Sequence, residues 1–460
     1  MDAPQFQQLS NLRQWFHKIY YAPKKDIPKL FQYFLQSIVP IGNQFCDDFI
    51  GLGKHGEVIQ SKLPSSLLFP TQDEFHDYVI KKIPLLPYQP KPNNPFLPQN
   101  ETPSNDLIHL IDSHQHFLLL CQKIPWIEII VNTMLNEFLI QKISPHFLTF
   151  GGFSLCKISA FPPSKPNEKF PLFQLFFEKI FKSTPERYIS FRDFMDVSHH
   201  SIIQLDSFLL YHQQTYHTID PVLIDSVLIS VLHSLHIMNS SFHITHNDLH
   251  IGNIFISFFS EAKDSFSREL TNKKYFGYVV PHESNPDLDE IYYLPNLQWI
   301  VKIADFGFSS FSLPHFAGIS QDTSYFRSKR TLFYNPEFPQ INQHSIPDYL
   351  LLFRDLEPYH NPTLQHILHT DPMFQLPVSL QELYHGTGSE ILQPKFVRTP
   401  ADLLHLYFAK YRSKPKDLVS DDDLILFNPK NLEIPNPVTP LPTSIPIQEN
   451  SPNILPTTSQ

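Results

Sequence analysis

The chain has 460 residues, of which 42% are hydrophobic and 17% are charged, and its formal net charge is −10. This length suffices for roughly two to three domains or one large two-lobed domain, and the acidic balance argues against a general nucleic-acid-binding surface. The three cysteines are too widely spaced for a disulfide framework or a zinc motif, and no apolar run of about 18 residues predicts a membrane span. We therefore expect a cytoplasmic protein with reduced thiols and no nucleic-acid partner.

Residues 1–44 are predicted to form two short amphipathic helices. Apolar residues recur at helical spacing in each of them: Leu12, Trp15, Phe16 and Ile19, then Leu30, Phe31, Phe34 and Leu35. We interpret this region as a helical extension that packs on the main domain, with a partner-docking arm as the alternative.

A glycine-rich segment follows, and it holds three of the 12 glycines of the chain. Its pattern is G-x-G-x-x-G-x-V, and the candidate nucleotide-binding residues are Gly51, Leu52, Gly53, Lys54, His55, Gly56 and Val58. A Rossmann turn has the same glycines but continues into a helix after the last one. Val58 and Ile59 favour a second strand instead, so we predict a hairpin that covers phosphate groups, with an ordinary β-turn as the alternative.

A strand is predicted at residues 78–83, in which Lys81 and Lys82 point to opposite faces because strand side chains alternate. The seven prolines between positions 84 and 103 are incompatible with a helix or a central strand. They indicate an exposed, extended insertion.

The next predicted helix runs from Ile129 to Ile143, with Glu137 inside it and Glu128 just before its start. The regions further along are predicted as strands at 147–161 and 187–195 and as a strongly apolar, buried helix at 221–238.

The stretch His246–Ile256 combines an acid, a nearby histidine and, five residues after the acid, a carboxamide. This spacing suits phosphoryl transfer. Asp248 can accept the proton of an attacking hydroxyl, and Asn253 can turn its amide oxygen onto a magnesium ion. Gly252 allows the backbone to fold tightly between these two groups.

A second acidic motif, Asp305-Phe306-Gly307, comes after an insertion at about 257–300 and ends a predicted strand that begins at Trp299. Asp305 would ligate a magnesium ion that bridges the nucleotide phosphates.

The last part of the chain contains Asn335-Pro336-Glu337 and then a helix start near Asp348. A final helix is predicted at 399–412, with Thr399 as its N-cap and Pro400 as its first residue. The proline-rich segment 416–460 is expected to be a disordered tail.

The joint order of these motifs resembles that of eukaryotic-type protein kinases, over about residues 45–415. The resemblance implies an α+β, bilobal fold, with a small, antiparallel, β-rich N-lobe at 45–195 and a mainly helical C-lobe at 196–415. The insertions, the low glycine content and His250 are similar to those of kinases of large cytoplasmic DNA viruses, including iridovirus-like ones, which would place the protein in the host cytoplasm or the virion.

The resemblance also implies the roles of the site residues. Asp248, Lys81 and Asn253 would be catalytic, Lys81 would pair the ATP phosphates, and Asn253 and Asp305 would hold Mg²⁺. The carboxylate of Asp348 would hold the backbone of the 246–256 stretch. Glu137 is our choice for the helix glutamate that pairs Lys81, and Glu128 is the alternative. ATP and Mg²⁺ would be the cofactors, and Ser/Thr hydroxyls of proteins would be the substrates.

Two positions depart from the family pattern. Asn247 replaces the arginine that receives an activation-segment phosphate, and His250 replaces a lysine that neutralises the transferring phosphate, which leaves a hydrogen bond but less charge. A small-molecule or lipid phosphotransferase and a pseudokinase scaffold are therefore kept as alternatives. A metal site at the clustered histidines near position 246 lacks a carboxylate or cysteine to complete it.

Overall fold

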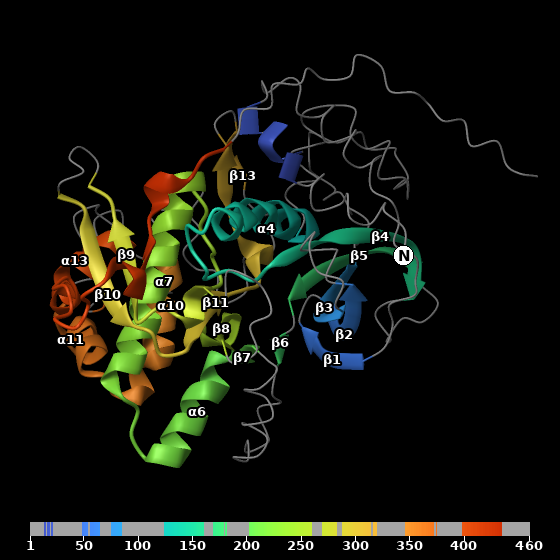
Figure 1. Cartoon of the computed structure of the whole chain (residues 1–460). Coiled ribbons are helices and arrows are strands. Elements are labelled where there is room, and N and C mark those ends of the chain that lie inside the picture. Colours follow the sequence, from blue (N-terminus) through green and yellow to red (C-terminus); the bar gives the residue numbers. More distant parts are fainter. Residues whose placement is uncertain are drawn as a thin grey trace, which may run out of the picture.

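The computed structural model of the chain describes most of residues 13–21, 48–64 and 75–84, then 124–160, 169–178, 180–181, 202–259, 269–282, 288–313, 316–319, 346–371, 374 and 398–434. For the strands between 48 and 84 and between 151 and 181 it describes the backbone, and among these strands the side chain of Lys81 as well. Figure 1 shows a β-sheet on one side, a group of helices on the other, and a single long helix between them.

A five-stranded antiparallel sheet has the order β1-β2-β3-β5-β4. Its strands are β1 (Asp48–Gly53), β2 (Gly56–Pro64), β3 (Phe75–Pro84), β4 (Phe150–Ala160) and β5 (Lys169–Glu178). Strands β1 and β2 form a hairpin in which Gly53 pairs with Gly56. The glycine motif therefore connects two strands, and the Rossmann alternative is wrong for this segment.

Helix α4 (Ile124–Ile140) is the long helix beside this sheet. Its side chains are buried on all faces from Ile127 to Phe138. A helix that is buried all round forms part of a core instead of covering a surface. The helix predicted at 129–143 is confirmed, and it begins five residues earlier than predicted.

Helix α7 (Pro221–Phe242) is the central helix of the other side and confirms the prediction at 221–238. The Asp220 side chain caps it by accepting from the Val222 amide, and Pro221 occupies the first turn. It is long and apolar enough to cross a membrane, but 83% of its most apolar window is buried inside the fold, as in the core helix of a globular domain.

The remaining described helices pack around α7 or extend from it (Figure 1). They are α6 (Leu205–Tyr216), α10 (Ile346–Leu356), α11 (Pro362–Thr370) and α13 (Pro400–Tyr407). Thr399 and Asp402 form a capping box at the start of α13, so the predicted N-cap is confirmed. Short 3-10 turns include η3 (Ile251–Asn253) and η5 (Phe306–Phe308), with others at Glu357–Tyr359, Ala409–Tyr411, Asp421–Asp423 and Pro429–Asn431.

A four-stranded sheet of order β11-β8-β7-β6 brings two distant motifs together. Strand β8 (Ile254–Phe258) starts where the 246–253 stretch ends, and β11 (Trp299–Ile303) ends just before Ala304 and Asp305. The two strands are antiparallel and Ile254 pairs with Ile303, so Asn253 and Ala304 are neighbours. The other members are β7 (Ile202–Gln204) and β6 (Ile180–Phe181), and a separate hairpin is formed by β12 (Phe311–Leu313) and β13 (Phe316–Ile319).

The prediction that residues 416–460 form a disordered tail is wrong for the part up to residue 434. Strand β14 (Leu424–Phe427) pairs in parallel with β9 (Tyr275–Val280), which also pairs with β10 (Glu290–Pro295). Pairing with β9 satisfies the backbone groups on one side of β14, and Phe427 is fully buried. Its ring lies 5.3 Å from Tyr278, 5.7 Å from Phe276 and 5.9 Å from His146 between centroids. A proline-rich composition therefore did not prevent this short segment from packing.

Several other predictions fall outside the described residues. Helical backbone is present at the described positions between 13 and 21. The second N-terminal helix, the insertion at 84–103, the strand at 187–195, the Asn335-Pro336-Glu337 motif and the tail after 434 all lie in parts of the chain that the structure does not describe.

Strand β14 supplies a stability test with a matched control on the same strand. Phe427→Ala should lower the free energy of unfolding by about 3–5 kcal/mol, because it empties a buried aromatic site. Leu426→Ala should cost clearly less, because Leu426 is 43% exposed. Urea unfolding of the two variants checks this. Equal and small effects of both would show that β14 contributes nothing to the core.

Candidate active site

The backbone of the loop from His246 to Asn253 is bound by the side chain of Asp348, which lies on α10. The Asp348 carboxylate accepts hydrogen bonds from the backbone N–H groups of His246 (2.8 Å) and Asn247 (2.6 Å). Asn247 has a left-handed backbone with φ of 64°, so this bonded carboxylate supports a strained turn. Burial raises the pKa of Asp348 to about 7, while the two N–H donors favour its ionised form. The predicted contact between Asp348 and the loop backbone is confirmed.

His246 connects the loop to the Asp305 motif. Its Nε2 lies 2.9 Å from the carbonyl oxygen of Ala304, and the Asp248 amide donates to its Nδ1 at 3.3 Å. Burial lowers the pKa of His246 to about 4, so the ring is neutral at pH 7. The two contacts require the tautomer that carries its proton on Nε2. The ring also lies 4.7 Å from that of Phe306.

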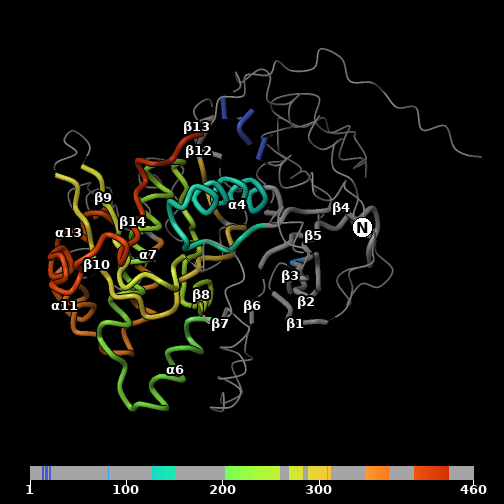
Figure 2. The backbone as a smooth tube through the Cα atoms, viewed as in Figure 1, coloured from blue at the N-terminus to red at the C-terminus, as the bar shows by residue number. Residues whose placement is uncertain are grey.

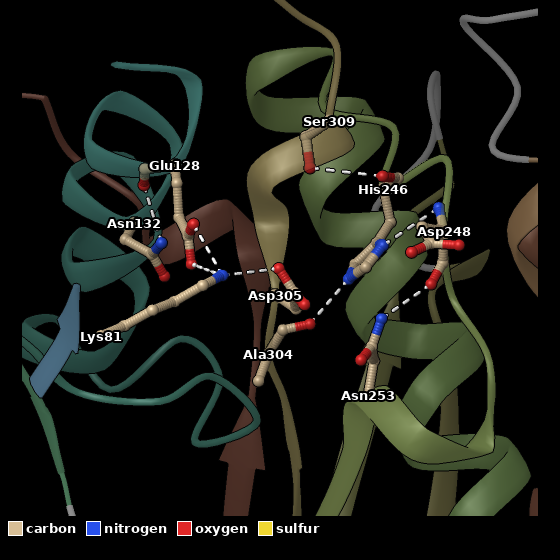
Figure 3. Close-up of polar contacts among 9 residues, drawn as sticks. All are labelled: Lys81, Glu128, Asn132, His246, Asp248, Asn253, Ala304, Asp305 and Ser309. Carbon is tan, nitrogen blue, oxygen red and sulfur yellow. Dashed lines mark hydrogen bonds and ion pairs between the residues drawn. The ribbon is translucent and has the colours of Figure 1, made fainter. Parts of the chain in front are cut away.

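Asp248 and Asn253 are joined within the loop. The Asn253 side-chain amide donates to the Asp248 carbonyl oxygen at 2.9 Å, and the Ala304 amide donates to the Asn253 carbonyl oxygen at 3.0 Å. Since its nitrogen is used as a donor, the Asn253 amide keeps its oxygen as the end available to a cation. Both residues lie on the same side of Asp305 in Figure 3.

Gly252 is required where the loop closes on itself. The His250 imidazole accepts from the Gly252 amide at 3.0 Å. A Cβ atom at position 252 would lie 2.7 Å from Cε1 of His250 and 3.0 Å from the Gln204 amide nitrogen. A larger residue here would force the His250 ring out of its contact with the Gly252 amide, so glycine at this position makes room for that ring.

Lys81 lies between two carboxylates that come from different elements (Figure 3). Its Nζ is 2.8 Å and 2.9 Å from the two oxygens of Glu128 and 2.8 Å from Oδ1 of Asp305. The Lys81 side chain is 16% exposed and that of Glu128 is 1% exposed, whereas Asp305 is 43% exposed. The triad thus joins β3, α4 and the residue that precedes η5.

The charge of Lys81 attracts both carboxylates of the triad, which repel each other. Burial alone would lower the pKa of Lys81, but the carboxylates of Asp305 and Glu128 raise it above its ordinary value, so the ammonium stays charged. Burial raises the pKa of Glu128 to about 7; the Lys81 charge opposes this rise and the Asp305 charge adds to it. The site therefore holds a permanent cation beside the exposed carboxylate of Asp305.

The choice of Glu137 as the partner of Lys81 is wrong, and Glu128 takes that place. The two glutamates are nine residues apart on α4. At about 100° per residue they lie on opposite faces of the helix. Glu137 instead contacts Arg13 and His17. The error came from placing the helix start at 129, which left Glu128 outside the helix.

The glycine hairpin adjoins the strand of Lys81. In the register of β2 and β3, Val58 pairs with Lys81 and Glu57 pairs with Lys82. Lys54 and His55 lie outside the described residues, as do the side chains of Leu52 and Val58. The nucleotide-binding role of Gly51, Leu52, Gly53, Lys54, His55, Gly56 and Val58 stays a prediction.

The donor set around Asp305 fits magnesium better than zinc. Mg²⁺ takes oxygen ligands and is commonly bound through one or two carboxylates together with phosphates and waters. Asp305 and Asn253 supply such oxygens at adjacent strand ends. In the described part of the chain, no group of three or more His, Cys, Asp or Glu side chains converges on a metal position.

Comparisons with known proteins give little beyond this geometry. No family model matches the chain, and no curated protein matches it. Among solved structures, a crystal structure of a kinase domain matches at 12% identity over 80% of this chain and 95% of that one, with a TM-score of 0.28.

The loop anchor can be tested by removing its acceptor. Asp348→Ala should destabilise the protein by about 2 kcal/mol or more, because the buried N–H of His246 and the half-buried N–H of Asn247 lose their partner and an unsatisfied buried group costs about 1–3 kcal/mol. Asp355→Ala is the matched control: this half-buried carboxylate accepts one loop N–H, from Ile251 at 3.0 Å. Chemical denaturation of both variants measures the difference, and a control as destabilised as Asp348→Ala would refute the anchoring role.

Proposed function

We propose that the chain is an ATP- and Mg²⁺-dependent protein kinase of the cytoplasm that transfers the γ-phosphate of ATP to Ser/Thr hydroxyls of proteins. The observation that carries the proposal is the contact of Lys81 with both Glu128 and Asp305. Phosphoryl transfer needs a cation for the phosphates and an acid for the metal in one place. On this proposal the sheet β1–β5 with α4 is one lobe, and the helices around α7 form the other.

Each residue of the site would have a separate role in the reaction. Lys81 remains charged and can contact phosphate oxygens while Glu128 holds its ammonium in position. Asn253 and Asp305 would hold Mg²⁺, which when bound neutralises charge on the phosphates. The glycine hairpin would lie over the phosphates, because its backbone runs beside the strand of Lys81.

Asp248 is the proposed base for the attacking hydroxyl. Its backbone is fixed at both ends, because its amide donates to His246 and its carbonyl accepts from Asn253. A fixed backbone keeps the carboxylate ready to accept the hydroxyl proton without reorganisation, and precise orientation of this kind is a major source of catalytic rate.

Asn247 supports a mode of activation without a phosphorylated segment. Its side-chain amide donates to the Ser310 hydroxyl at 3.2 Å, and the backbones of Thr245 and Ser310 exchange two hydrogen bonds of 2.9 Å. These neutral contacts tie the loop to the segment after Asp305. Asn247 has no charge with which to bind a phosphate, and the contacts to Ser310 form without one. We therefore propose that the kinase is active without an activation-segment phosphate.

A small-molecule or lipid phosphotransferase on the same fold is the second candidate. His250 favours it, because its imidazole is engaged with the Gly252 amide where a protein kinase would have a lysine cation. Incubation of the full chain with labelled ATP, Mg²⁺ and either generic protein substrates or amino-alcohol and lipid acceptors separates the two. Nucleotide binding without transfer to any acceptor would instead favour a pseudokinase scaffold.

Lys81→Met should abolish phosphate transfer, because it removes the cation that pairs the phosphates while it keeps most of the side-chain volume. Lys82→Met is the matched control, since neighbouring strand residues point to opposite faces. Transfer of labelled phosphate is the measurement, with circular dichroism to verify folding. Loss of activity in Lys82→Met with activity retained in Lys81→Met would overturn the assignment.

Asp248→Asn should bind ATP nearly as tightly as the parent chain, yet turn over about 10²–10⁴-fold more slowly, which is the usual contribution of a general base. The amide preserves the shape of the side chain but accepts no proton at pH 7. Calorimetry gives the nucleotide affinity and a turnover assay gives the rate. Near-normal turnover would remove Asp248 from the mechanism.

A further inference from the structure

Glu137 is a buried carboxylate that the proposed chemistry does not use. It is 1% exposed, and it accepts hydrogen bonds from Arg13 Nε at 2.8 Å and from Arg13 Nη2 at 3.1 Å. His17 Nε2 lies 3.1 Å from the same carboxylate. A two-point guanidinium–carboxylate contact is among the stronger polar contacts in proteins. The N-terminal segment 13–21 is thus attached to the face of α4 opposite the one that carries Glu128.

The same segment also contacts the other side of the molecule. Phe16 is buried, and its ring lies 5.7 Å from that of Phe242, the last residue of α7. Phe242 in turn lies 5.2 Å from Phe138 of α4. The chain passes from Phe242 directly into the loop that begins at His246. Segment 13–21 therefore packs at a junction between α4 and the end of α7 (Figure 2).

Residues 433–434 complete this junction. The Gln141 side chain donates to the Glu433 carbonyl oxygen at 2.7 Å and accepts from the Glu433 amide at 2.8 Å. Gln141 also donates to Glu137 at 3.0 Å. The Tyr21 hydroxyl donates to the carbonyl oxygen of Ile434. Two stretches from opposite ends of the described chain thus meet at the C-terminal end of α4.

We propose that Arg13 and Glu137 are positioning residues for phosphoryl transfer: segment 13–21, together with residues 433–434, holds α4 where Glu128 reaches Lys81. This inference rests on the proposed kinase function. Because α4 is one rigid helix, a movement that withdraws Glu128 from Lys81 also strains the contacts of Glu137. A buried carboxylate that loses its cation is strongly destabilising, so the contact disfavours the displaced position of α4.

The test uses the full chain with Arg13→Met, Arg13→Lys and the control Lys18→Met, which removes a cation from the same segment. Arg13→Met should lower kcat by about tenfold or more, the loss of a charged hydrogen bond, with little change in KM for a protein substrate. Hydrogen–deuterium exchange should become faster in the amides of residues 124–132. Arg13→Lys should restore part of kcat, because it keeps the charge but not the two-point geometry.

Glu137→Gln provides a second route to the same contact. It should slow turnover at least as much as Arg13→Met does, and the double variant should be no slower than Glu137→Gln alone, because both substitutions remove the Arg13–Glu137 contact and only Glu137→Gln also alters the contacts with His17 and Gln141. Lys18→Met should match the parent chain in kcat and in exchange. Unchanged kcat and unchanged exchange of residues 124–132 in both Arg13→Met and Glu137→Gln would overturn the inference.

The exchange measurement separates this inference from the proposed function. If the parent chain transfers no phosphate to any acceptor, the proposed kinase function fails, while faster exchange of residues 124–132 in Arg13→Met still shows that segment 13–21 holds α4. If the parent chain is active and Arg13→Met matches it in turnover and exchange, the kinase function stands and the positioning role fails.

Discussion

The ammonium of Lys81, shared between Glu128 and Asp305, is the interaction on which the arrangement of the site depends. Three elements that are far apart in the sequence meet at this one nitrogen atom. The Lys81 ammonium pairs with both carboxylates, so its loss would leave the buried Glu128 without a cation. Asp305 is the most exposed of the three side chains, so a ligand would reach the triad from the side of Asp305.

The positions of the 246–253 loop and of Ala304 follow from the register between strands β8 and β11. The pairing of Ile254 with Ile303 places the end of the 246–253 loop beside Ala304, and the His246 ring then bonds the Ala304 carbonyl. Asp348 fixes the same loop from α10. Each of these contacts joins a side chain to a backbone atom, so the conformation of the loop is set within the fold itself.

The sequence predicted those parts of the fold that are determined by residues close together in the chain. The hairpin at the glycine motif follows from the strand-forming residues Val58 and Ile59, and the start of α13 follows from the Thr399–Pro400 pair. The contact of Asp348 with the loop was predicted by family resemblance. The packing of Phe427 could not be predicted in the same way, because its partners Tyr278 and His146 come from distant segments.

Two predictions from the sequence proved wrong, and the residues concerned lie at the same place in the structure. Glu137 was assigned to Lys81, and the stretch that contains residues 433–434 was assigned to a disordered tail. Both belong to the junction at the C-terminal end of α4, where Arg13 binds Glu137 and Gln141 binds Glu433. A helix with acidic residues on two opposite faces has two residues that could pair with Lys81. The periodicity of the helix does not indicate which of its faces lies toward Lys81. The choice is made by the segments that pack on each face: β3 brings Lys81 to the face of Glu128, and segment 13–21 brings Arg13 to the face of Glu137.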